Sequence, residues 1–221
     1  AELDRIAEEA IRARGGVPSE KGYEGFPGSI CASPDDMVVH GIPSEKTVLR
    51  EGQIISIDCT VLLDGYQADM ARTFPVGKIS PEAQSLIDAA KESFGEGLKM
   101  ARSGNRIGDI SAAVQACVEG HGYGVVRSLC GHGIGKEMHE DPEVPNFGKA
   151  GHGPRLREGM CIAVEPMITA GDYRVYIAAD DWAFLTRDHS IAAHYENTLA
   201  ITADGDPLIL TMPNGFDGED V

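Results

Sequence analysis

Long apolar runs and paired cysteines are both missing from this chain. No segment of 18 or more apolar residues is present, so the sequence predicts no membrane-spanning helix. The five cysteines are an odd number and none are spaced as CxxC, which argues against a disulfide framework and a thiolate zinc site. We therefore expect reduced thiols.

Basic charge is also scarce. Lys and Arg together number 19 against 35 Asp and Glu, which gives a formal net charge of −16. Such a surface repels polyanions, so we expect no binding to nucleic acid or to an anionic membrane. Metal cations are better suited as partners.

The chain begins without an initiator methionine, a basic n-region or an apolar h-region. Its first residues, AELDRIAEEAIRARGG, have the pattern of an amphipathic helix and not of a signal peptide. We therefore expect a cytoplasmic protein whose N-terminal segment has been truncated. At the other end, the acidic residues 214–221 predict a disordered tail.

The composition is that of one globular domain spanning residues 1–221, with 42% hydrophobic and 24% charged residues. Within it, LREGQIISID at 49–58 returns as LREGMCIAVE at 156–165, which is 107 positions later. Apolar residues at helical spacing near the start recur at the same offset, and HGI occurs at 40–42 and at 132–134. We infer two related halves, about 1–105 and 106–221, that meet at a cleft.

Strands are predicted within residues 54–65, 161–169 and 197–210, where β-branched and apolar residues are followed by turn signals. A helix is predicted over 80–101, which starts with Ser-Pro and continues with apolar residues at helical intervals. These elements predict an α+β fold, an antiparallel sheet covered by helices.

Four carboxylates follow or lie within these apolar strands. Asp58 and Asp69 flank a turn at Asp64-Gly65, so a hairpin would point both to one face. Glu165 ends its own strand in the second half, and Glu196 lies in another strand-like stretch. They could be surface charges or salt-bridge partners. The repeat weakens that interpretation, because Asp58 and Glu165 occupy equivalent positions after apolar residues.

Two histidines, His132 and His139, lie in the glycine-rich stretch GHGIGKEMHEDP. Each could be a structural residue. Alternatively, one imidazole and four carboxylates form a group of ligands whose negative charge two divalent cations would balance. Ligands that are mainly oxygen, with one nitrogen, favour Mn, Fe, Co or Zn. A pair of such ions would activate water and polarise a carbonyl, which is hydrolase chemistry.

Several stretches closely resemble the pita-bread metallopeptidases, and among them type I methionine aminopeptidases. The resemblance rests on HGIP at 40–43, IDCTVLLDGYQADMARTF, GHGIGKEMHEDPEVPN, VEPM at 164–167 and HYENT at 194–198. It implies a pita-bread fold with two pseudo-two-fold related halves. It also implies two divalent metal ions, held by Asp58, Asp69, His132, Glu165 and Glu196, with Asp69 and Glu196 bridging.

The same resemblance implies the catalytic and substrate-binding roles. His139 would hydrogen-bond the scissile carbonyl oxygen, His40 would contact the next amide nitrogen, and Glu165 would shuttle protons. The implied pocket for the substrate side chain consists of Tyr23, Phe26, Cys31, His40, Met138, Met167 and Trp182. The substrate would be a peptide or nascent chain with methionine first and a small second residue, cleaved by a monomer in transient contact with the ribosome.

Three departures from the family pattern, Gln67, Met138 and Asn197, put pocket shape and metal surroundings in question but leave the ligands intact. The nearest alternative is an X-Pro peptidase of the same fold, a prolidase or aminopeptidase P. Another is a pita-bread binding protein that has lost catalysis. A preference for X-Pro substrates would identify the X-Pro peptidase. The presence of all five ligand residues argues against a binding protein that has lost catalysis.

Overall fold

The computed structural model describes residues 1–203 and 205–212, so the predicted tail at 214–221 lies outside the described residues. The helices are α1 (Glu2–Ala13), η1 (Tyr23–Gly25), α2 (Pro81–Met100) and α3 (Ile107–Gly120). The helix expected over 80–101 is confirmed, and its N-cap is Ser80, whose hydroxyl accepts a hydrogen bond from the Ala83 N–H at 3.1 Å. Among the described residues, no helix is long and apolar enough to cross a bilayer.

Fifteen strands account for most of the remaining regular structure in the described part of the chain, and all their pairings are antiparallel. In the first half they are β1 (Val17–Pro18), β2 (Cys31–Pro34), β3 (Met37–Val39), β4 (Ile54–Leu63) and β5 (Tyr66–Pro75). In the second half they are β6 (Gly124–Val125), β7 (Cys130–Gly133), β8 (Glu140–Pro145), β9 (Cys161–Val164), β10 (Met167–Thr169), β11 (Val175–Ile177), β12 (Phe184–Thr186), β13 (Ala192–His194), β14 (Asn197–Ala200) and β15 (Leu208–Ile209).

The longest pairing is the hairpin of β4 and β5, which turns at Asp64-Gly65 as predicted. Asp58 is paired with Ala71, and Thr60 with Asp69. Because side chains two residues apart on a strand share a face, Asp58 and Asp69 lie diagonally on the same face of the hairpin.

The second half has an equivalent arrangement that is interrupted in the middle. β9 pairs with β14 and β10 pairs with β13, and the two ladders are separated at Glu165 and Glu196. Such interruptions divide the described strands into four hydrogen-bonded sheets, where the sequence had suggested one. The Glu165 and Glu196 side chains are buried at these breaks.

The offset of 107 residues recurs in the structure. Adding 107 to the bounds of β1 gives 124–125, which are the bounds of β6, and the same shift places β4 on the segment containing β9 and β10. The two parts meet where β5 lies beside β14: the Glu196 N–H donates to the Ala71 carbonyl at 2.9 Å. The division into half-repeats remains a prediction about the domain.

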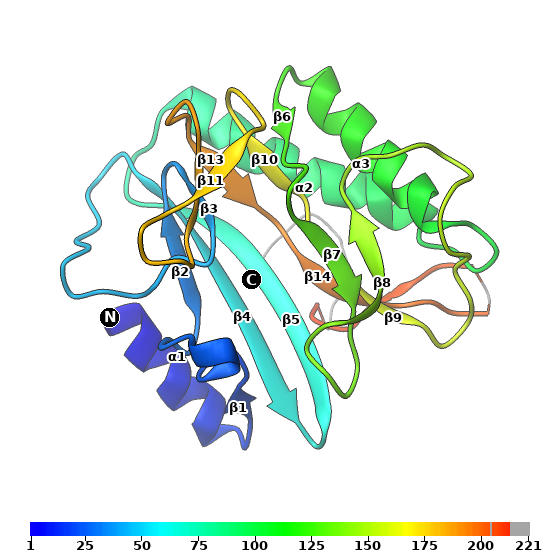
Figure 1. Ribbon diagram of the computed structural model, residues 1–221, viewed down its shortest axis with the longest axis horizontal. Coiled ribbons are helices and arrows are strands. Elements are labelled where there is room, and N and C mark those ends of the chain that lie inside the picture. Colours follow the sequence, from blue (N-terminus) through cyan, green and yellow to red (C-terminus); the bar gives the residue numbers. More distant parts are fainter. Residues whose placement is uncertain (204, 213–221) are drawn as a thin grey trace.

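Helices α2 and α3 pack against each other on one side of the strands, as Figure 1 shows, whereas α1 lies at the edge beside β1. The main core fills the space between this helical layer and the sheets, with Leu86, Phe94, Ile110, Ile162 and Ile168 almost fully buried. The predicted α+β class, with helices covering antiparallel strands, is confirmed.

Candidate metal centre and substrate pocket

The five predicted ligands come from five separate places in the fold and converge. Asp58 lies on β4, Asp69 on β5 and His132 on β7, while Glu165 and Glu196 lie at the interruptions described above. His132 Nε2 is 3.9 Å from Asp69 Oδ2 and 3.6 Å from Glu165 Oε1. Ligand atoms of Asp69, His132 and Glu196 lie within 4.8 Å of one another, and so do those of Asp58 and Asp69. The structure thus brings the whole set together.

The carboxylates of this centre are buried and incompletely satisfied. In the part of the chain that the structure describes, Asp58 Oδ1, Asp69 Oδ1 and Glu196 Oε1 are buried without a hydrogen-bond partner. Burial raises the pKa of Asp58, Glu165 and Glu196 well above its ordinary value, and the neighbouring Asp69 carboxylate raises it further. Buried carboxylates that repel one another are stabilised by cations, so this donor set fits divalent metal ions.

His132 presents its Nε2 atom to the carboxylates because its other nitrogen is engaged. Nδ1 lies 2.8 Å from the Gly133 carbonyl oxygen, which can only accept, so Nδ1 carries the proton and the Nε2 lone pair is free for a metal. Both flanking glycines are sterically required. A Cβ at Gly131 would lie 2.3 Å from the Ala163 carbonyl oxygen, and one at Gly133 would lie 2.2 Å from that of Asp141.

His139 and His40 lie beside the centre. The His139 ring is 4.4 Å from that of His132, centroid to centroid, and its Nδ1 is 2.9 Å from the Tyr23 hydroxyl. Burial, then the nearby His132, lowers the pKa of His139. His40 adopts a left-handed φ of 58° and packs against Phe184, and burial lowers its pKa as well.

A cavity of about 220 Å³ opens beside these groups. Six of the seven predicted pocket residues line it, namely Tyr23, Phe26, Cys31, His40, Met138 and Trp182. The Phe26 and Trp182 rings pack edge to face with centroids 5.1 Å apart. Met167 is not among its lining residues. It lines a neighbouring cavity of about 510 Å³ together with His132 and Glu165.

Comparison with known proteins decides the family. Residues 1–203 match metallopeptidase family M24. A methionine aminopeptidase of Clostridium acetobutylicum is 57% identical over 212 residues, which cover 96% of this chain and 84% of that protein. The chain belongs to the methionine aminopeptidases of family M24.

Solved structures agree with this assignment. The crystal structure of methionine aminopeptidase from Rickettsia prowazekii matches with a TM-score of 0.93 at 38% identity, over 96% of this chain and 85% of that chain. An X-Pro aminopeptidase from Thermotoga maritima matches with a TM-score of 0.70 at 22% identity, over 96% of this chain and 52% of that one, which shows a shared fold alone. The predicted resemblance and the pita-bread fold are confirmed. As an M24 metallopeptidase, the chain is a hydrolase that uses divalent metal ions.

Sequence reasoning missed Glu20, which lines the small cavity of this M24 metallopeptidase. Glu20 is 7% exposed, its Oε1 accepts a hydrogen bond from the Thr60 N–H at 2.5 Å, and its Oε2 has no partner among the described residues. Burial and then the Asp69 carboxylate raise the pKa of Glu20 to about 8. The sequence pattern that could have identified Glu20 is strand alternation, because Pro18 and Glu20 lie on the buried side of an extended segment that begins at β1.

His194 was also missed, although it opens the HYENT stretch. It is 1% exposed, and its Nε2 lies 3.8 Å from Glu165 Oε2 and 3.7 Å from Glu196 Oε2. Neither ring nitrogen has a hydrogen-bond partner in the described part of the chain. Burial lowers the pKa of His194 to about 3, so the ring is neutral and can offer a lone pair to the centre. Alternation in the strand-like stretch HYENT would have placed His194 on the same face as Glu196.

The three departures have distinct places in this metallopeptidase. Met138 lines the small cavity. Gln67 lies near the hairpin tip, where its Oε1 accepts from the Ser19 hydroxyl at 2.5 Å. The Asn197 Oδ1 atom accepts from the buried Arg72 guanidinium at 2.9 Å, so this residue supports the backbone beside Glu196. Only Met138 therefore contacts the space that a substrate side chain would fill.

Proposed function

We propose that this chain removes the N-terminal methionine from peptides and nascent proteins with two divalent ions. The residues that would hold the ions are Asp58, Asp69, His132, Glu165 and Glu196, with Asp69 and Glu196 as the expected shared ligands. The observation that carries the proposal is the convergence of these buried, incompletely satisfied groups beside a small cavity, whose wall includes Asp58 and Asp69 together with Phe26, Met138 and Trp182.

Bound divalent ions supply Lewis acidity, which lowers the pKa of water and polarises a carbonyl group. The chain's own groups complete the reaction. Glu165 takes a proton from the attacking water and returns it to the departing amine. The free N-terminal amine of the peptide would bind an ion held by these carboxylates, which would limit cleavage to the first residue.

His139 stabilises the oxyanion that forms at the scissile carbonyl. The Tyr23 hydroxyl lies 2.9 Å from His139 Nδ1. We assign the hydroxyl as the donor, because this tautomer leaves the proton on Nε2 for the oxyanion. Tyr23 is therefore a positioning residue as well as part of the pocket wall. His40, held in a left-handed conformation between the two cavities, hydrogen-bonds the amide nitrogen of the second substrate residue.

The pocket selects methionine by size and by soft contacts. A volume of about 220 Å³ accepts one unbranched side chain, and the Phe26, Trp182 and Met138 side chains offer aromatic and sulfur contacts to a thioether. The carboxyl of Glu20 is a polar group in this otherwise apolar and aromatic part of the wall.

A ligand set of four carboxylates and the His132 imidazole suits Co, Mn, Fe or Zn. We further propose a cytoplasmic monomer that contacts the ribosome transiently and binds no nucleic acid.

One paired experiment tests this function. Metal analysis of protein purified without added metal is followed by assays of Met-Gly-Met and of an X-Pro dipeptide with each candidate ion. We expect about two equivalents of ion and release of methionine. Preference for the X-Pro substrate would favour the prolidase alternative, and binding of peptide without release would favour a non-catalytic role.

A further inference from the structure

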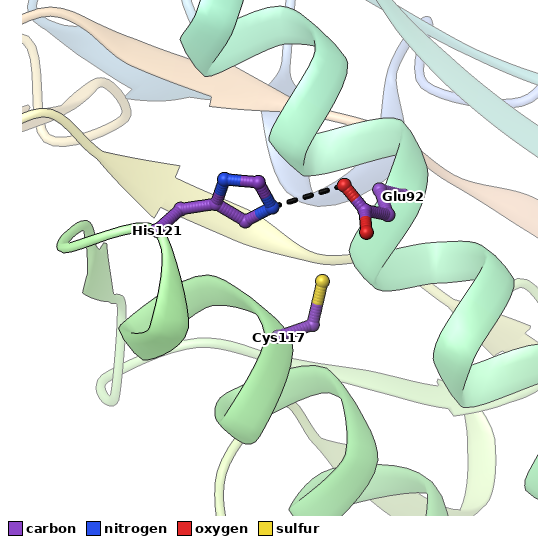
Figure 2. Close-up of side chains that lie close together, drawn as sticks. All are labelled: Glu92, Cys117 and His121. Carbon is purple, nitrogen blue, oxygen red and sulfur yellow. Dashed lines mark hydrogen bonds and ion pairs between the residues drawn. The ribbon is translucent and has the colours of Figure 1, made fainter.

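A second group of potential metal ligands lies outside the active site, where α2 and α3 pack together. Glu92 projects from α2, Cys117 from α3, and His121 is the C-cap of α3. One ligand atom from each residue lies within 4.8 Å of the other two, and His121 Nε2 is 2.9 Å from Glu92 Oε2. Figure 2 shows the Cys117 sulfur directed toward the space below this pair.

The helix itself sets the relation between two of these side chains. Cys117 and His121 are four residues apart, and His121 keeps helical dihedral angles, with its N–H bonded to the Cys117 carbonyl at 3.2 Å. Residues at this spacing lie on one face of a helix, one turn apart. The His121 ring also stacks on Tyr123, with an angle of 14° between the ring planes, which limits its rotation. Packing of α2 then supplies the third ligand.

We propose that Glu92, Cys117 and His121 form a binding site for a single divalent cation of the Zn²⁺ type, which links α2 to α3. Thiolate, imidazole and carboxylate are the three ligand types that zinc accepts, at about 2.0 to 2.3 Å, and three protein ligands leave the fourth position to water. The Cys117 thiol releases its proton to the solvent as the metal–sulfur bond forms. This site is independent of the proposed peptidase function.

The surrounding charges favour a cation over a free thiolate. Burial, then the Glu92 and Glu96 carboxylates, raise the pKa of Cys117 to about 11, and Lys99 opposes this effect. Without a cation the thiol therefore stays protonated, and the same carboxylates attract a dication. The side chains of His121 and Glu92 are 40% and 57% exposed, so an ion can enter directly from the solvent.

Cobalt provides a test that separates this site from the dinuclear centre, whose proposed ligands include no cysteine. Co²⁺ is titrated into the full chain after the dinuclear centre has been saturated, and the thiolate-to-cobalt charge-transfer band is recorded. We expect one further equivalent to bind, with a band that is absent in Cys117→Ser. The matched control is Cys161→Ser, which removes another half-buried thiol of raised pKa outside this cluster and should keep the band.

The second ligand is tested in parallel. His121→Ala should weaken binding of this further Co²⁺ or Zn²⁺ equivalent by about tenfold or more, while methionine release from a peptide stays unchanged. No thiolate band in the native chain, or a band that survives in Cys117→Ser, would overturn the proposal. Unchanged affinity in His121→Ala would likewise show that the His121–Glu92 pair is only a surface ion pair.

Discussion

Tyr23 and His139 are 116 residues apart in the chain, yet the Tyr23 hydroxyl lies 2.9 Å from His139 Nδ1. Tyr23→Phe removes this bond and should lower kcat about tenfold, which corresponds to ~1.4 kcal/mol, while KM and bound metal stay unchanged. Steady-state kinetics with a methionyl peptide measure this. The control is Tyr66→Phe at the exposed hairpin tip, which should change neither constant. Equal effects of both substitutions would contradict the positioning role.

Variants of the proposed metal ligands should lose bound metal, whereas a variant of the proposed oxyanion donor should keep it. Asp69→Asn and His132→Ala should abolish activity because they lose metal, whereas His139→Ala should keep metal and lower kcat by about 10² or more, the scale for losing an oxyanion donor. Elemental analysis of the same samples used for kinetics distinguishes the two outcomes. Near-normal turnover in metal-loaded His139→Ala would remove that residue from the mechanism.

Glu20 makes the metal-free protein sensitive to pH. Its pKa is raised from 4.5 to about 8 in the folded state, so the folded chain holds more protons than the unfolded chain between these values, and stability falls as pH rises through this window. Glu20→Gln should raise the unfolding midpoint of chelator-treated protein at pH 8 by at least about 2 °C, and change it little near pH 4.5. Thermal scans at both pH values check this. A pH-independent effect would contradict the assignment.

Trp182 should act through substrate binding. Trp182→Ala removes one side of the edge-to-face pair with Phe26 and opens the pocket, so KM for a methionyl peptide should rise about tenfold or more while kcat changes less. Comparing peptides that begin with methionine and leucine adds a specificity readout. If KM stays at its original value, the substrate side chain lies elsewhere.

The stability of helix α2 can be changed without changing the active site. Ser80→Ala removes the N-cap of α2 and should cost about 1 kcal/mol, which lowers the unfolding midpoint by about 2 to 4 °C. Activity at 25 °C should be unchanged. Ser103→Ala, at an exposed position between α2 and α3, is the control and should leave the midpoint within error.

Local patterns in the sequence determined much of this protein. Helix 80–101 and the turn at Asp64-Gly65 follow from capping, apolar spacing and turn chemistry, which act over a few residues. The LREG repeat identified Asp58 and Glu165 as equivalent carboxylates that follow apolar residues, and the motifs around them identified the family. Strand alternation also placed Asp58 and Asp69 on one face of the predicted hairpin.

Only the tertiary structure decided which distant groups share a site. Glu20 and His194 join the carboxylates because β1 pairs with β4 and β13 pairs with β10, and nothing local to either residue specifies those partners. Met167 faces a different cavity from Trp182 for the same reason. Glu92 likewise meets Cys117 and His121 only through the packing of α2 on α3. Local propensities set the elements, but long-range burial sets which side chains become neighbours, and the chemistry of both sites depends on those neighbours.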